Sequence, residues 1–315
     1  MKKTFLYFCL LFIVQTAFAA DSLYVREQQI PILIDRIDNV LYEMRIPAQK
    51  GDVLNEITIQ IGDNVDLSDI QAIRLFYSGV EAPSRKGEHF SPVTYISSHI
   101  PGNTRKALES YSVRQDEVTA PLSRTVKLTS KQPMLKGINY FWVSIQMKPE
   151  TSLLAKVATT MPNAQINNKP IDITWKGKVD ERHVGIGVRQ AGDDGSAAFR
   201  IPGLVTTNNG TLLGVYDIRY NSSVDLQEKI DIGVSRSTDK GQTWEPMRVA
   251  MTFQQTDGLP HGQNGVGDPS ILVDEKTNTI WVVAAWTHGM GNERAWWNSM
   301  PGMTPDETAQ LMLVK

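Results

Sequence analysis

The chain has 315 residues, with 32 basic and 34 acidic side chains, a formal net charge of −2 and a single cysteine. A balance so close to neutrality provides no basic surface for nucleic acid, so we expect no nucleic-acid partner. The length allows two domains, and glycine and proline are scattered without a low-complexity tract.

Residues 1–19 have the pattern of a secretory signal peptide. Lys2 and Lys3 precede the apolar run TFLYFCLLFIV, which is too short to span a bilayer, and the small residues of AFA at 17–19 offer a cleavage site. We therefore expect export to the periplasm, the cell surface or the medium, with no membrane span. The only cysteine, Cys9, leaves with this segment, and the net charge becomes −4 because two lysines leave too.

Metal and cofactor chemistry has little support in the sequence. Without cysteine the mature chain has neither a disulfide nor a cysteine-type zinc site. His261 and His288 have no partner at ligand spacing, although calcium stays open. We expect no cofactor and no metal.

Residues 22–175 alternate between apolar and polar side chains, as half-buried strands of antiparallel sheets do. The apolar positions are Ile57, Ile59, Ile61, Val126, Leu128, Phe141, Val143, Ile145 and Met147. This region is predicted to be a jelly-roll-like β-sandwich, similar to carbohydrate-binding domains. Tyr77, Tyr95 and Trp142 could stack on sugars, but an aromatic in an alternating strand is more often core.

Residues 183–315 are predicted to begin a β-propeller. The segments AAFRIPGLVTT and TLLGVYDIRY flank the tight turn NNG, a strong hairpin signal. KIDIGVSRS and TWEPMRVAM then complete four antiparallel strands, the size of one blade. DPSILV and TIWVVAAW, an insertion at 287–306 and TAQLMLVK supply three strands of a second blade.

The segment STDKGQTW, residues 237–244, has the form Ser-x-Asp-x-Gly-x-Thr-Trp and lies between the third and fourth strands of the first set. Asp239 can accept backbone N–H bonds in the turn, Gly241 can take positive φ, and Trp244 can cover the hairpin base. Turn chemistry explains every position, so this segment is expected to support the fold and not to act in catalysis.

This segment matches the Asp-box of sialidases and related propellers, and it follows Phe-Arg-Ile-Pro (199–202) within the same four strands. Together the two motifs resemble bacterial exo-sialidases (neuraminidases), in particular secreted gut-bacterial forms with an N-terminal sandwich. The resemblance covers 183–315, and more weakly 22–175. It implies an all-β fold, a sandwich followed by the first blades of a six-bladed propeller that is incomplete here. It also implies an exo-α-sialidase that hydrolyses terminal sialic acid from glycoconjugates with retention.

The resemblance assigns Arg200 to a grip of three arginines on the sialic-acid carboxylate. A guanidinium suits this task because its fork meets a carboxylate bidentately. The surrounding SAAFRIPGLV looks like a buried strand, where an arginine needs a ligand or an ion-pair partner. A structural ion pair with a core acid is the alternative.

The resemblance also places Arg219 at the substrate and Asp225, six residues later, as general acid/base. An aspartic acid that protonates a leaving oxygen needs a raised pKa, which enclosure by a loop can supply. The alternative for Asp225 is an ordinary solvated loop carboxylate.

Two further substrate contacts are predicted. Asp268, in GVGDPSIL, corresponds to an aspartate that binds the sugar's amino substituent or hydroxyls, although Asp-Pro is also a common turn at strand entry. Trp296, in the insertion, could line the space for the N-acetyl methyl group, or it could pin the loop to the propeller.

The sequence departs from the family pattern after residue 220. No tyrosine follows Tyr220 to act as nucleophile, and Arg236, Arg248 and Arg294 do not occupy the other two clamp positions. The expectation is an N-terminal piece of a longer enzyme, inactive alone, with sialylated glycans as partners and an unknown oligomeric state. The alternatives are a glycan-binding module or a non-catalytic Asp-box propeller.

Overall fold

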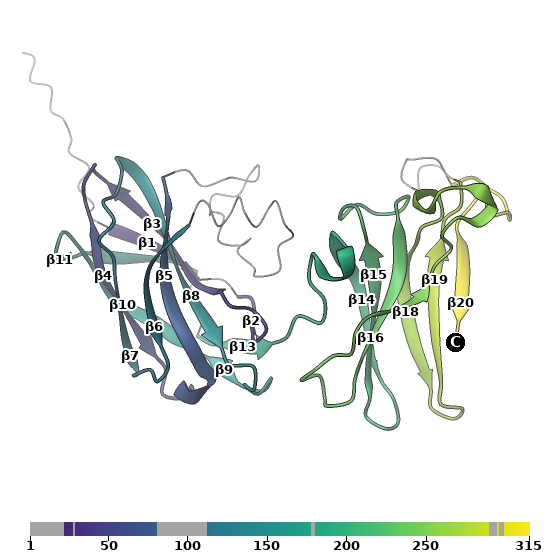
Figure 1. The fold of residues 1–315 in the computed structure, drawn as a ribbon, viewed down its shortest axis with the longest axis horizontal. Coiled ribbons are helices and arrows are strands. Elements are labelled where there is room, and N and C mark those ends of the chain that lie inside the picture. Colours follow the sequence, from purple (N-terminus) through teal and green to yellow (C-terminus); the bar gives the residue numbers. More distant parts are fainter. Residues whose placement is uncertain (1–21, 28, 81–111, 178–179, 290–294, 296–298) are drawn as a thin grey trace, which may run out of the picture.

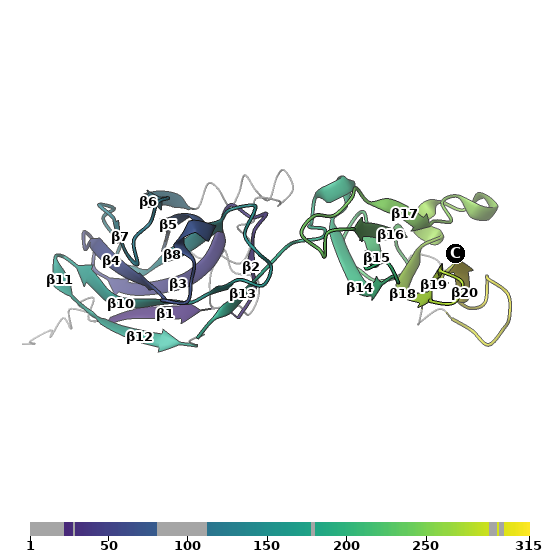
Figure 2. The ribbon, with the colours of Figure 1, turned by 90° about the horizontal axis from the view of Figure 1, so that it is seen from below.

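The computed structural model describes residues 22–27, 29–80, 112–177, 180–289, 295 and 299–315 (Figure 1). These residues form two groups of β-sheets, joined by a segment that follows residue 185, as both ribbon views show (Figures 1 and 2). The all-β prediction is confirmed. No helix among the described residues is long and apolar enough to cross a membrane.

Two facing sheets make up the first group. One has six strands in the order β12-β1-β3-β8-β5-β6, and the other has four in the order β11-β10-β4-β7. The strands of the first sheet are β1 (Ser22–Glu27), β3 (Asn39–Ala48), β5 (Ile70–Gly79), β6 (Val113–Thr119), β8 (Gly137–Met147) and β12 (Asp172–Lys176). Those of the second are β4 (Leu54–Ile61), β7 (Thr125–Thr129), β10 (Thr159–Ile166) and β11 (Lys169–Pro170).

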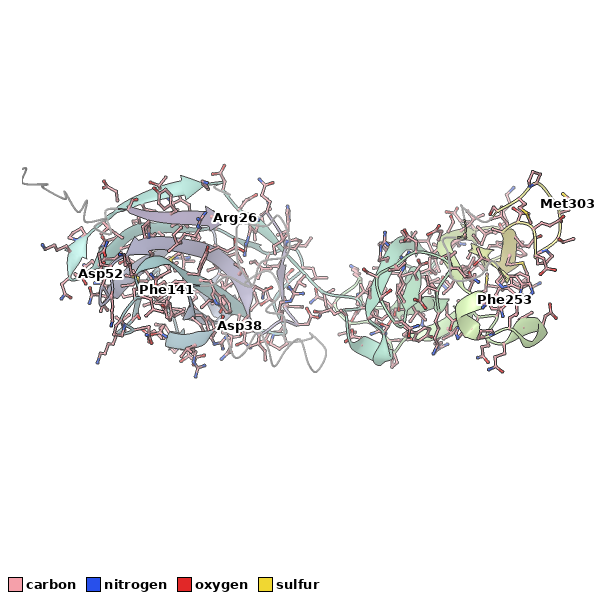
Figure 3. All side chains as sticks on the ribbon, turned by 90° about the horizontal axis from the view of Figure 1, so that it is seen from above. Arg26, Asp38, Asp52, Phe141, Phe253 and Met303 are labelled. Atoms are coloured by element: carbon pink, nitrogen blue, oxygen red, sulfur yellow. The ribbon has the colours of Figure 1, made fainter. Side chains whose placement is uncertain are left out.

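The predicted alternation places one face of each strand in the core. Every apolar position predicted in residues 22–175 is buried, including Ile59 of β4 and Phe141 of β8. Phe141 lies within the first group of sheets (Figure 3). Tyr77 and Trp142 are buried as well, and Trp142 stacks on Phe76 with ring centroids 4.0 Å apart. Neither ring is available to a sugar; Tyr95 lies outside the described residues.

A small third sheet closes this group. It has the order β2-β13-β9, with β2 (Ile32–Leu33), β9 (Lys156–Val157) and β13 (Arg182–Gly185). Strand β13 runs parallel to β2, so residues up to Gly185 pair with strands that precede them. The predicted domain limits at 175 and 183 remain a prediction.

The second group begins with the four predicted antiparallel strands, in sequence order: β14 (Ala198–Thr206), β15 (Leu212–Arg219), β16 (Ile230–Ser237) and β17 (Arg248–Met251). A three-stranded sheet follows, with β18 (Val266–Asp274), β19 (Thr279–Trp286) and β20 (Gln310–Val314). Short 3₁₀ turns connect elements of the chain: η1 (Leu67–Asp69), η3 (Asp193–Gly195), η4 (Thr256–Gly258) and η5 (His261–Gln263).

These two sheets pack against each other as neighbouring blades. Strand β18 contacts β14, β15 and β16, and the sheets lie side by side in both ribbon views (Figures 1 and 2). The two sheets share an apolar core: Val215 and Ile232 come from the four-stranded sheet, and Val266, Val282 and Trp286 come from the three-stranded sheet. The face of β15 that carries Val215 also carries Asp217 and Arg219, because side chains alternate along a strand. The same packing therefore brings polar groups of β15 to β18.

Candidate active site

The Asp-box forms a turn that satisfies its own polar groups. Asp239 accepts hydrogen bonds from the Ser237 hydroxyl (2.8 Å), the Thr243 amide (3.0 Å) and the Thr243 hydroxyl. The Trp244 indole donates to the Gly241 carbonyl at 3.1 Å, and Gly241 has φ +92°. Hydrogen bonds from Thr243 and Ser237 lower the pKa of Asp239 to about 2. Each group has a partner inside the turn, which supports the fold role.

Arg200 is not buried as the sequence predicted. Its side chain is 41% exposed, because β14 is the outermost strand of its sheet. The pairing with β15 shifts register between Arg200 and Gly203, and Ile201 has φ +54° at this irregularity and is itself exposed. The apolar neighbours in the sequence misled the prediction, since alternation in β14 breaks where Arg200 lies.

Arg200 and Arg219 converge on one carboxylate oxygen. The Nη1 of each donates to Oδ1 of Asp225 at 2.6 Å, and each Nη1 also donates to the Ser223 carbonyl at 3.0 Å. The structure thus brings together three residues that the sequence predicted, from β14, β15 and the loop that follows β15. The cation at Arg200 is exposed, whereas the side chain of Arg219 is 1% exposed.

The electrostatics of Asp225 differ from the sequence expectation. Hydrogen bonds from Arg219, together with the charges of Arg200 and Arg219, lower the pKa of Asp225 below its ordinary value. A general acid needs the opposite shift. In this arrangement Asp225 is ionised at neutral pH and serves as counter-ion to both arginines.

Asp217 is a member of the cluster that the sequence did not reveal. Its side chain is fully buried, and its Oδ2 accepts from Nε (3.1 Å) and Nη2 (2.7 Å) of Arg219. Its Oδ1 accepts from the backbone N–H of Asp268 at 2.9 Å. Burial raises the pKa of Asp217 to about 6, opposed by the hydrogen bonds and charge of Arg219. The signal was the Asp-x-Arg spacing in YDIRY, which puts both side chains on one face of a strand.

Asp268 lies on β18 at a second irregularity. Pairing of β18 with β19 shifts register between Gly267 and Ser270, and Asp268 has φ +56°. Its side chain is exposed, while its backbone N–H is fixed by Asp217. Asp268 therefore belongs to the same cluster through its main chain.

The loop that carries Asp225 is supported by contacts of Leu226 and Gln227 with residues 287 and 295. Leu226 packs with Ile230 and Ala295 in a buried apolar cluster, and its carbonyl accepts from the Ala295 amide at 3.1 Å. The hydroxyl of buried Thr287 donates to the side-chain amide oxygen (Oε1) of Gln227. The insertion at 287–306 therefore contacts the loop at residue 295; the predicted Trp296 lies outside the described residues.

The other candidate groups have structural partners. Arg236 and Arg248 pair with Glu245 beside the Asp-box, and His261 binds Asp231 at 2.8 Å; Arg294 lies outside the described residues. Within the described part of the chain, no group of three or more His, Cys, Asp and Glu side chains is placed to hold a metal ion.

Comparison with known proteins gives a consistent family. Residues 20–170 match the N-terminal domain of BNR-repeat neuraminidase. The whole chain is 56% identical to a sialidase of Bacteroides fragilis, of which it spans 59%. A sialidase of Paraclostridium sordellii is 34% identical over 36% of this chain and 26% of that protein. The solved structure of the Hadza microbial sialidase Hz136 is 60% identical with a TM-score of 0.81, over 92% of this chain and 56% of that one.

The chain thus spans less than two thirds of the length of the Bacteroides fragilis sialidase and of the Hadza sialidase structure. The match to the latter agrees with the all-β fold predicted from the sequence. The alignment with the first relative spans the segments of both Phe-Arg-Ile-Pro and the Asp-box, because it covers the full length of the chain. Over its whole length, the chain is homologous to part of a bacterial sialidase (neuraminidase).

Proposed function

We propose that the cluster of Arg200, Arg219 and Asp225 is part of an exo-α-sialidase site that binds the carboxylate of a terminal sialic acid. One observation carries this proposal: two arginines from different strands direct N–H groups to a single oxygen, and one of them is exposed. A carboxylate ligand suits such a pair because bidentate, charge-assisted hydrogen bonds are the strong ones.

Asp225 is proposed as the acid/base. When a substrate carboxylate takes the fork of Arg200, that guanidinium no longer stabilises the charge of Asp225, and the pKa of Asp225 rises. Binding and protonation of Asp225 are thereby coupled. The protonated group then donates its proton to the leaving glycosidic oxygen and later accepts one from the attacking water, as retention requires.

The remaining catalytic groups are proposed to come from the part of the relatives that this chain does not span. In the family pattern these are a tyrosine nucleophile, its glutamate and two arginines of the carboxylate grip. A tyrosine suits this substrate, whose own carboxylate repels an anionic attacker. Asp268 is proposed to bind the sugar's amino substituent or hydroxyls, and Trp296 to line the space for its N-acetyl methyl group.

Turnover of a fluorogenic sialoside tests the proposal. We expect a chain extended to the full length of its relatives to hydrolyse the reporter, the 315-residue chain to show no turnover, and Arg200→Ala to abolish activity in the extended chain. Arg236→Ala is the matched control, because Arg236 pairs with Glu245 away from the cluster and is also exposed. Activity that survives Arg200→Ala would refute the proposed role.

A non-catalytic propeller is the second candidate. The ion pair between Arg200 and Asp225 favours it, since both charges have partners without any ligand. If the propeller is non-catalytic, Arg200→Ala in the extended chain should have only a small effect, on the free energy of unfolding.

Export is proposed from the sequence of residues 1–19, to the periplasm, the cell surface or the medium. N-terminal sequencing of the mature protein from its host tests this, with cleavage after residue 19 as the expected result.

A further inference from the structure

We propose that Asp217 is a positioning residue that fixes the substrate-binding groups of two adjacent blades relative to each other. Its carboxylate holds the side chain of Arg219 on its own strand and the backbone of Asp268 on β18. The geometry of this contact stands by itself, while its role in ligand binding rests on the proposed function.

Asp217 orients the side chain of Arg219 through two hydrogen bonds. It accepts from Nε and Nη2, so these donors are engaged below the surface and Nη1 is directed to Asp225 and Ser223. A buried guanidinium needs a counter-charge, because its desolvation costs several kcal/mol. Asp217 supplies it at full burial, and leaves one N–H edge of Arg219 for the site.

Asp217 also links its own blade to the neighbouring one. The Asp268 amide donates to the other oxygen of Asp217 across the packed faces of β15 and β18. Asp268 adopts φ +56°, a conformation that residues other than glycine rarely take, so it needs support from its surroundings. A charge-assisted bond to its N–H provides such support, and it sets where the exposed Asp268 side chain begins.

Asp217 is also next to Arg200, the third predicted ligand residue. In the register of β14 and β15, Asp217 pairs with Arg200, so the residue that contacts β18 is also next to Arg200. A single side chain therefore has direct contact with the residues that carry two predicted ligand groups, and it is next to the third. This arrangement gives the site its geometry before any ligand binds.

The test uses the 315-residue chain and the substitution Asp217→Asn, with Asp231→Asn as matched control. Asp231 is also a buried aspartate on a neighbouring strand, but its partners are Tyr220 and His261. NMR hydrogen exchange is measured at the Asp268 amide and the Arg219 Nε–H of this chain. Binding of N-acetylneuraminic acid is measured by calorimetry with the same substitutions in the chain extended to the full length of its relatives, because two arginines of the proposed carboxylate grip lie outside the 315 residues.

We expect exchange at both groups to become at least about tenfold faster in Asp217→Asn, since a neutral acceptor replaces a carboxylate. The dissociation constant of the sugar should rise at least about tenfold in the same variant. Asp231→Asn should leave both exchange rates and the sugar affinity unchanged.

A folded Asp217→Asn variant with wild-type exchange at both groups would overturn the proposal. Loss of protection at Asp268 and Arg219 with unchanged sugar affinity would overturn its functional part. If the extended wild-type chain does not bind the sugar, the proposed function fails, and the exchange rates still decide the positioning of Arg219 and Asp268. If Asp217→Asn does not fold, Asp217→Asn with Arg219→Gln removes both buried charges. Faster Asp268 exchange in that folded double variant supports the proposal, and unchanged exchange contradicts it.

Discussion

Two aspartates of the same blade show how similar electrostatics can serve different ends. Asp239 in the Asp-box and Asp225 beside the arginines both have pKa values below the ordinary value. For Asp239 the cause is Thr243 and Ser237, which belong to its own turn. For Asp225, which lies in a loop, the cause is Arg219 of β15 and Arg200 of β14.

The difference shows what distinguishes a carboxylate that stabilises a turn from one that belongs to a ligand-binding site. The partners of Asp239 are fixed by eight consecutive residues, and no ligand can replace them without opening the turn. The guanidinium of Arg200 is exposed, so an anion from solvent can compete with Asp225 for it. A lowered pKa alone therefore does not identify a functional carboxylate, whereas the source and exposure of its partners do.

The largest expected effect is a difference in the free energy of unfolding between substitutions of the buried Arg219 and the exposed Arg200. Arg219→Gln leaves Asp217 buried without its counter-charge, and we expect a loss of about 3–5 kcal/mol in the free energy of unfolding at pH 7. Arg200→Gln should cost under about 1 kcal/mol, because its ion pair is in contact with water. Urea unfolding measures both, and equal losses would contradict the described geometry.

The next effect concerns the support of the Asp225 loop. A Cβ at Gly265 would lie 2.3 Å from the Glu228 carbonyl oxygen and 2.7 Å from Leu226. Gly265→Ala should therefore displace the loop at a cost of about 1–3 kcal/mol. Gly262→Ala is the control, since its nearest atom is the Lys229 nitrogen at 3.9 Å. Thermal unfolding of the two variants checks this, and similar midpoints would show that the loop is not packed as described.

A smaller effect concerns the charge on Asp225. Arg200→Gln removes one of the two cations that stabilise its carboxylate, so the pKa of Asp225 should rise toward its ordinary value. The pKa of Asp239 should not change, because its partners lie in the Asp-box. Carboxyl ¹³C titration by NMR follows both groups in one sample. If the pKa of Asp225 is the same in Arg200→Gln and in the wild type, Arg200 is not a cause of its lowered pKa, and the contrast with Asp239 is wrong.

The smallest effect is the pH dependence that Asp239 contributes. Its pKa falls from 3.8 to about 2 on folding, so its stabilising contribution is present above pH 3.8 and is lost as the pH falls toward 2. Asp239→Asn should remove this part of the acid destabilisation. Unfolding midpoints from pH 5 to pH 2 measure it, and parallel curves for the two proteins would exclude the linkage.

Sequence patterns predicted the fold well where alternation is regular. Ile57, Ile59 and Phe141 are buried as expected, and the hairpin at Asn209–Gly210 joins β14 to β15. Prediction failed at Arg200, where an irregular pairing breaks the alternation that the apolar neighbours suggest. The Asp-x-Arg spacing in YDIRY signals the pairing of Asp217 with Arg219, but no local pattern encodes the contact of Asp217 with a backbone N–H of another sheet.

The claim that Arg200, Arg219 and Asp225 form a ligand site is tested most directly in a ¹³C-labelled chain extended to the full length of its relatives, by titrating it with N-acetylneuraminic acid and following the pKa of Asp225 and Asp239. We predict that saturating sugar raises the pKa of Asp225, because the sugar carboxylate binds Arg200, and leaves the pKa of Asp239 unchanged. An unchanged pKa of Asp225 at saturation, or equal shifts at both groups, would contradict it.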